Sequence, residues 1–235
     1  MLMARWVAAS TMNHEAFDQI FDERPKVHEG GSEPICWGIH REVGELIYQS
    51  VDENSVTLET GAGLSTLVFA LRRSSHTAIT PSTGEIESIS EYAASHSISM
   101  NSVRFVNAGS ETYLPTARIE KSLDLVLIDG RHSFPFPMID YFYTAPKIRE
   151  GGLLLVDDVD LPSVGMLDRF LVVDTNWRLK KRFARRTSVF EKIGNELDVD
   201  WDHQRYNLLY LPKSNVIKRI TRKGRKLSRR FSKED

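Results

Sequence analysis

The chain has one cysteine, Cys36, among its 235 residues, so an intrachain disulfide and a thiolate metal cluster are excluded. It has no run of about 20 apolar residues, the length that a membrane-spanning helix needs. It has no internal repeat and no low-complexity tract, which excludes solenoids and propellers. An apolar fraction of 41% is ordinary for a globular protein. We therefore expect a globular chain with a buried core, in a cytoplasmic setting.

The net charge of −1 hides an uneven distribution. Residues 213–235 hold ten Lys or Arg against two acids, and five apolar residues are interspersed among them. Such a basic amphipathic stretch is typical of a helix that lies on an anionic membrane surface. A solvated tail and a nucleic-acid contact are the alternatives. The sequence thus predicts peripheral membrane contact through this tail, and it leaves the oligomeric state open.

Short β-type runs alternate with helical stretches along most of the chain. The runs at 55–59, 77–80, 103–107, 123–128 and 152–156 predict strands, and those at 37–49, 65–73, 85–95 and 139–149 predict helices. This alternation indicates a parallel sheet with helices on both faces. Trp177–Phe183 and Thr187–Lys192 predict a closing antiparallel hairpin. We expect a Rossmann-like α/β fold with seven mostly parallel strands and this C-terminal hairpin.

Four segments follow from this pattern. Residues 1–36 predict a helical N-terminal extension that ends in a loop at the Gly- and Pro-containing stretch 28–34. Residues 37–194 form the main domain, residues 195–212 a connecting segment, and residues 213–235 the basic tail.

Two glycines follow the first predicted strand, in the stretch Glu-Thr-Gly-Ala-Gly-Leu-Ser-Thr at 59–66. Gly61 and Gly63 allow a tight turn and the close approach of a ligand. The helix that begins here offers free N–H groups, and Ser65 adds a hydroxyl donor. A tight turn without a ligand is the alternative interpretation. A nicotinamide site would require a third glycine where Thr66 stands.

With Glu59 two residues ahead of Gly61, this stretch resembles motif I of class I methyltransferases. The resemblance implies that Glu59 and the glycine loop hold the methionine end of S-adenosylmethionine. That family usually has an acid at the end of the second strand for the ribose hydroxyls, where this chain has Thr80. Thr80 supplies one such hydrogen bond, and Glu85 is close enough in sequence to reach back. Ser110 and Glu111, after the third strand, stand where the family contacts adenine; a solvated loop acid is the alternative for Glu111.

Three aspartates follow two strands that the family places side by side. Asp129 ends the run Leu-Val-Leu-Ile at 125–128, and Asp157 and Asp158 end the run 152–156. Carboxylates at the ends of neighbouring strands repel one another unless a positive charge lies between them. A divalent cation that binds oxygen ligands is the simplest source of that charge. Adjacent aspartates point to opposite sides of a regular strand, so both serve only if the chain bends there. Helix capping and solvent exposure are the alternative roles.

These aspartates resemble the metal site of metal-dependent O-methyltransferases, of the catechol and cephalosporin-modifying types. The resemblance implies that Asp129, Asp157 and Asp158 hold Mg²⁺ or Mn²⁺, and it covers roughly residues 37–192. His132, three residues after Asp129, is a candidate general base, with a structural role as its alternative. The aromatic stretch 134–143 is either an acceptor pocket or part of the core.

The leading interpretation is methyl transfer from S-adenosylmethionine to a hydroxyl of a small molecule or glycan. Methylation of nucleic-acid bases is disfavoured, because the Asn/Asp-Pro-Pro-aromatic motif is missing after the fourth strand. Two alternatives remain: a non-catalytic ligand-binding protein of the same fold, and a nucleotide-dependent oxidoreductase.

Overall fold

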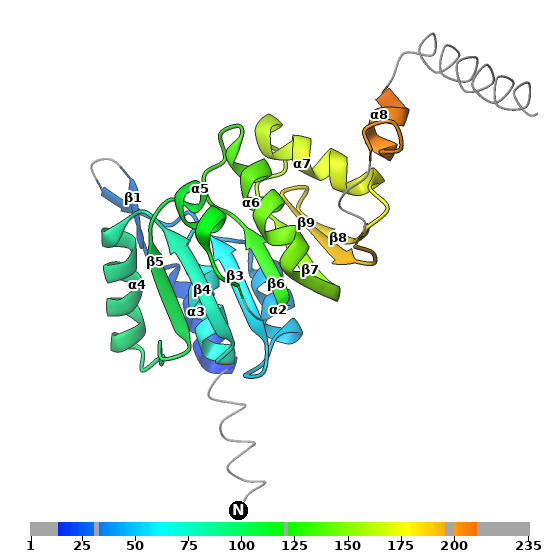
Figure 1. Ribbon diagram of the computed structural model, residues 1–235. Helices are drawn as coiled ribbons and strands as arrows, with labels where there is room; N and C mark the ends of the chain where they lie inside the picture. The colour runs from blue at the N-terminus through cyan, green and yellow to red at the C-terminus, as the bar shows by residue number, and fades with distance from the viewer. Residues whose placement is uncertain (1–13, 31–32, 120–121, 196–199, 211–235) are drawn as a thin grey trace, which may run out of the picture.

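The computed structural model describes residues 14–30, 33–119, 122–195 and 200–210 (Figure 1). The predicted basic tail at 213–235 and the start of the N-terminal extension lie outside the described residues. Within the described part of the chain, no helix is long and apolar enough to cross a membrane.

A seven-stranded sheet forms the centre of the molecule. Its strands lie in the order β5-β4-β3-β6-β7-β9-β8. The first five of these are parallel, and β9 runs antiparallel to both β7 and β8. Their bounds are β3 Val56–Thr60, β4 Ser75–Thr80, β5 Val103–Asn107, β6 Leu123–Ile128, β7 Ile148–Val156, β8 Trp177–Phe183 and β9 Thr187–Lys192. The predicted fold class, including the bounds of the closing hairpin, is confirmed.

Helices cover both faces of this sheet (Figure 1). One face packs against a helix at 14–23 and against α2 (Arg41–Ser50), α3 (Leu64–Arg72) and α4 (Thr83–Ser95). The other face packs against α5 (Ser110–Tyr113), α6 (Phe136–Thr144) and α7 (Pro162–Val173). A short helix, α8 (Arg205–Tyr210), follows at the end of the described chain and contacts α7.

The central strands alternate between these two cores. Leu125 and Leu127 of β6 belong to the cluster under α3, whereas Val126 and Ile128 belong to the cluster under α7. All four side chains are buried, which explains why the run is apolar without a break.

The predicted helix at 139–149 is wrong at its end. Helix α6 ends at Thr144, a 3₁₀ turn spans Ala145–Lys147, and β7 already begins at Ile148. Pro146 cannot donate the backbone hydrogen bond that would continue the helix. Lys192 stabilises the turn that follows. Its buried Nζ donates to the carbonyls of Ala145 at 2.8 Å and Ile148 at 2.7 Å.

The predicted loop at 28–34 is also wrong. Here β1 (His28–Gly30) pairs with β2 (Glu33–Ile35) as a small antiparallel sheet. Helix α7 was not predicted either. Helix α7 lies between β7 and β8 in the sequence. It packs on the sheet through the buried side chains of Leu167 and Leu171.

Candidate functional site

A cavity of about 880 Å³ opens at the carboxyl ends of the parallel strands. Residues that follow β3, β4, β5, β6 and β7 all contribute to its wall, as expected for the switch point of a doubly wound sheet. Of the residues named from the sequence, the cavity is lined by Gly61, Gly63, Ser65, Thr80, Glu85, Ser110, Glu111, Asp129, His132 and Asp158. Glu59 and Asp157 do not line it.

The glycine loop, residues 61–63 between β3 and α3, is held on its buried side by a chain of hydrogen bonds. The amide of Gly63 donates to Thr66 Oγ1 at 3.0 Å, and the Thr66 hydroxyl donates to Glu59 Oε1. Both side chains are fully buried. The acid of the motif therefore supports the loop through Thr66 instead of facing the cavity. The residue that breaks the nicotinamide pattern is the one that supplies the link.

Gly61 is required where the loop meets β6. Its φ of +92° lies in the region that favours glycine. A Cβ at this position would stand 2.4 Å from the carbonyl oxygen of Asp129. The backbone of the loop and the backbone after β6 thus approach as closely as glycine permits.

His28 contacts the same loop on the cavity side. Its Nδ1 accepts from the amide of Trp37 at 3.2 Å, so Nε2 carries the proton and donates to the carbonyl of Ala62 at 3.0 Å. His28 and Trp37 both line the cavity, and Trp37 is 59% exposed. Sequence reasoning missed both residues, because His28 belongs to the unpredicted strand β1 and Trp37 stands before α2, which begins at Arg41 and not at 37 as predicted.

The end of β4 carries a carboxylate after all, although not on the strand. The hydroxyl of Thr80 donates to Glu85 Oε2 at 2.6 Å. Ser82 caps α4 by accepting from the amide of Glu85 at 3.1 Å, and this cap fixes the first turn of the helix. Glu85 therefore reaches back to the strand end, where the family pattern would have an acid.

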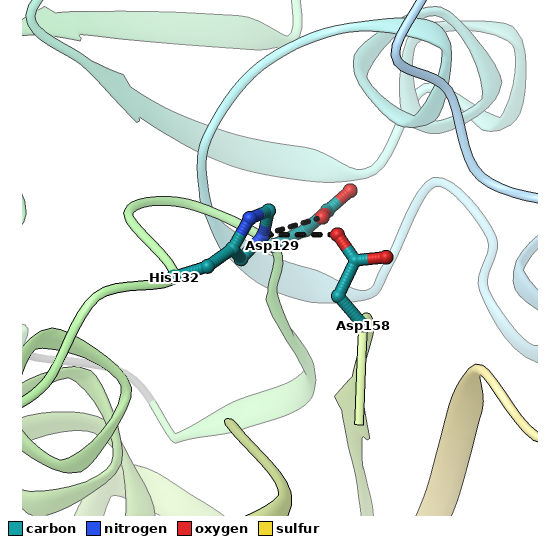
Figure 2. A group of neighbouring side chains, drawn as sticks. All are labelled: Asp129, His132 and Asp158. Atoms are coloured by element: carbon teal, nitrogen blue, oxygen red, sulfur yellow. Dashed lines mark ion pairs between the residues drawn. The ribbon is translucent and has the colours of Figure 1, made fainter. Parts of the chain in front are cut away.

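Asp129, His132 and Asp158 form a compact cluster at the cavity wall (Figure 2). His132 Nε2 lies 3.5 Å from Asp129 Oδ1 and 3.2 Å from Asp158 Oδ2. The φ of Asp158 is +55°, so the chain does bend directly after β7. The bend that both aspartates would need to share the site is therefore present, but only Asp158 lines the cavity.

Asp157 points elsewhere. It is fully buried, accepts from the hydroxyl of Thr187, and lies 3.1 Å from Arg186 Nη2. Arg186 Nε also lies 2.6 Å from Asp158 Oδ1. The expected trio of aspartates is thus replaced by Asp129, Asp158 and His132, with Arg186 as the positive charge between Asp157 and Asp158. Arg186 reaches the site only because the turn between β8 and β9 folds over the end of β7.

Protonation in this cluster is strongly perturbed. Burial raises the pKa of Asp129 from 3.8 to about 7, against the opposing effect of His132. The contact with Asp129 raises the pKa of His132. Burial also raises the pKa of Asp157, despite its bond to Thr187. The pKa values of Asp129 and His132 are thus both raised, by burial and by their mutual contact respectively, as is common at functional sites.

The aromatic stretch 134–143 belongs mainly to the surroundings of the site. Tyr141 packs in the α7-side core and accepts from Trp177 Nε1 at 3.0 Å. Phe134 is 64% exposed and does not line the cavity. Among the described aromatic side chains, Trp37 is the one that faces the cavity.

A family model described as a methyltransferase domain matches residues 58–159. A search of curated proteins gave no match. Among solved structures, the O-methyltransferase TomG from Streptomyces achromogenes, in complex with SAM, has a TM-score of 0.58 at 16% identity, covering 74% of this chain and 89% of that one. Cofactor-bound Rv0187 from MTB has a TM-score of 0.59 at 14% identity, covering 77% and 89%. An rRNA methylase from Streptococcus thermophilus has a TM-score of 0.52 at 13% identity, covering 66% and 96%.

At these identities the solved structures establish the shared fold, and the family model shows that residues 58–159 resemble a methyltransferase domain. The matched segment runs from β3 to just beyond β7, so it includes the glycine loop, Glu85 and the Asp129 cluster. Residues 58–159 are therefore similar to a methyltransferase domain, and the chain shares its fold with S-adenosylmethionine-binding methyltransferases.

Proposed function

We propose that the protein transfers the methyl group of S-adenosylmethionine to a hydroxyl oxygen of a small-molecule or glycan acceptor. One observation carries this proposal: the glycine loop and a proton-accepting Asp129–His132 pair line the same cavity. TomG, which shares the fold, is an O-methyltransferase of tomaymycin synthesis. The absence of the base-methylation motif after β6 favours a small acceptor over a nucleic acid.

The cofactor carries the activated methyl group, so the protein's task is alignment and proton removal. The acceptor oxygen attacks the methyl carbon opposite the sulfur, and the sulfur leaves as a neutral thioether. The hydroxyl proton passes to the Asp129–His132 pair, in which burial raises the pKa of Asp129 to about 7. Asp158 and Arg186 hold the imidazole in place.

For the cofactor, we assign the methionine end to the loop of Gly61 and Gly63 and to Ser65 at the start of α3. Glu59 supports this loop from below. Thr80 and Glu85 are assigned to the ribose hydroxyls, since carboxylate and hydroxyl oxygens accept such bonds at the end of β4. Glu111, in the first turn of α5, is assigned to the adenine side.

Calorimetric titration with S-adenosylmethionine and S-adenosylhomocysteine tests this assignment. We expect micromolar binding, about −7 to −8 kcal/mol. Glu85→Gln should raise the dissociation constant about tenfold, because a charged hydrogen-bond acceptor is lost. Glu87→Gln is the matched control, since Glu87 is exposed on the same helix. Absence of binding by the wild-type protein would refute the proposed function, and preferential binding of a nicotinamide cofactor would favour an oxidoreductase.

We also propose that a divalent cation binds between Asp129, Asp158 and His132. One ligand atom from each of these side chains lies within 4.8 Å of the others, and burial raises the pKa of Asp129, an effect that a bound cation would oppose. An imidazole nitrogen in the donor set suits Mn²⁺ better than Mg²⁺, which prefers oxygen ligands. A bound cation would lower the pKa of the acceptor hydroxyl and fix its orientation. Asp157 is no longer a candidate ligand, because Thr187 and Arg186 occupy its carboxylate.

Titration with Mn²⁺ in the presence of S-adenosylhomocysteine separates the two neighbouring aspartates. Asp158→Asn should weaken Mn²⁺ binding at least tenfold, whereas Asp157→Asn should change it less than threefold. Equal effects of the two substitutions would contradict this choice of ligands. No detectable Mn²⁺ binding by the wild-type protein would refute the cation, and Asp129 and His132 would then be proton acceptors and not metal ligands.

We propose, finally, that the basic residues 213–235 bring the protein to an anionic membrane surface. The support is their charge and the exposure of Leu208 (44%) and Leu209 (62%) in α8, which leads into this segment. Vesicles of anionic lipid should pellet the full chain but not a variant that ends at Pro212. Equal pelleting of both proteins would refute the membrane contact, and binding to RNA instead would indicate a nucleic-acid partner.

A further inference from the structure

A fully buried polar network lies beneath the glycine loop. It begins at His76, in β4, whose Nε2 lies 3.1 Å from Glu59 Oε1 and whose Nδ1 lies 2.8 Å from Thr57 Oγ1. Glu59 in turn accepts from Thr66, which accepts from the amide of Gly63. The exposed fraction of each of the four side chains is 1% or less. The network therefore joins the interior of β4 to the loop without contact with solvent.

The direction of the hydrogen bonds assigns a proton to His76 Nδ1. Ser74 donates to the carbonyl of Phe69 at 3.4 Å, so its oxygen accepts from Thr57 at 3.1 Å. The Thr57 hydroxyl hydrogen is then used, and Thr57 Oγ1 must accept from Nδ1–H of His76.

The other ring nitrogen faces a carboxylate. A bare nitrogen lone pair 3.1 Å from Glu59 Oε1 would repel it, so a second proton lies between His76 and Glu59. The N–H does not point straight at the oxygen, and attraction between opposite charges is then the main contribution. The ring also stacks on Phe69, with centroids 4.1 Å apart and planes 13° apart. An aromatic face favours a cationic partner.

We propose that His76 is a positioning residue for the cofactor: a buried imidazolium that keeps Glu59 ionised and oriented, so that Glu59 fixes Thr66 and Thr66 fixes the amide of Gly63. This inference rests on the proposed function, since the loop matters only if it binds the cofactor. A buried carboxylate without a counter-ion would lose its charge or turn away. In either case Thr66 would no longer be held, and the loop would lose the geometry that the bond from Gly63 to Thr66 fixes at the cavity wall.

Nitrogen-15 NMR of the histidine side chains tests the charge state in the wild-type protein. His76 should show both ring nitrogens protonated at pH 8. A neutral imidazole at His76 overturns the proposal, and this readout does not depend on whether any variant folds.

A double-mutant cycle tests the coupling to the loop. His76→Phe and Thr66→Val should each raise the dissociation constant of S-adenosylhomocysteine about tenfold, and the double variant should be no weaker than about tenfold, because both changes break one chain. Faster hydrogen exchange at the Gly63 amide should accompany both single changes. An additive loss of about a hundredfold, or unchanged binding in His76→Phe, overturns the proposal.

Ile89→Ala is the matched control, since Ile89 is fully buried in the same core but lies outside the network. It should lower the melting temperature and leave the dissociation constant within twofold. If Ile89→Ala weakens binding as much as His76→Phe, the effect is one of general stability and the positioning role is refuted. Failure of the wild-type protein to bind S-adenosylhomocysteine is a different result, because it refutes the proposed function itself.

Discussion

The two sides of the cavity, the glycine loop and the cluster of Asp129, His132 and Asp158, differ in how their polar groups are held. On the glycine-loop side, backbone groups are held by side chains with a matching donor or acceptor: Ala62 by His28, and Gly63 by Thr66. On the acidic side, Asp129 and Asp158 share His132 at distances of 3.5 and 3.2 Å, and the pKa of Asp129 is raised to about 7. The first arrangement fixes a shape, whereas the second is ready to change its protonation. This difference agrees with the proposal that the loop side binds the cofactor and the acidic side takes part in the reaction.

The largest expected effect separates reaction from binding. Asp129→Asn and His132→Gln should each lower the rate of methyl transfer at least about 100-fold, since a proton acceptor is lost. The affinity for S-adenosylhomocysteine should change less than threefold, because the loop side is intact. Transfer of a radiolabelled methyl group to a panel of hydroxylated metabolites, with calorimetry alongside, measures both quantities. If affinity falls as much as rate, the two sides are not functionally distinct.

The next effect concerns the point where the two sides touch. Gly61→Ala should destabilise the fold by at least about 3 kcal/mol, because its Cβ would clash with the carbonyl of Asp129 in addition to the strain of a positive φ. Gly151→Ala is the matched control, with a φ of +74° but only Arg149 Nη1 nearby, at 3.3 Å. It should cost about 1 kcal/mol. Chemical denaturation of both variants gives the comparison, and equal losses would show that backbone strain alone decides.

The smallest effect is on stability as a function of pH. The folded-state pKa of Asp129, about 7, exceeds the ordinary value of 3.8, so the charged form is disfavoured by folding. Its contribution to stability is fully present below pH 4 and is lost as the pH rises through 7. Asp129→Asn should therefore raise the free energy of unfolding at pH 8 by about 1–2 kcal/mol, which corresponds to a rise of a few degrees in melting temperature. The gain should shrink towards pH 5. A constant difference between pH 5 and pH 8 would contradict the raised pKa.

The residues near Pro146 show where local patterns stop being informative. The apolar periodicity of 139–149 predicts one helix, yet the chain turns at Ala145 and starts a strand at Ile148. The proline signals a break, but the partner that stabilises the break is Lys192, more than forty residues later. A local pattern cannot include an interaction that forms only when β9 packs beside β7.

The sequence by itself determined the succession of features along the chain. These are the alternation of strands and helices, the glycine turn after the first predicted strand, and the acids after the fourth and fifth predicted strands. These features depend on short-range rules, namely the period of apolar residues and the backbone freedom of glycine. The tertiary structure alone decided which acids meet. The bend at Asp158 and the reach of Arg186 from the β8–β9 turn remove Asp157 from the cluster. Side-chain direction and long-range packing set these contacts, and no spacing along the chain encodes them.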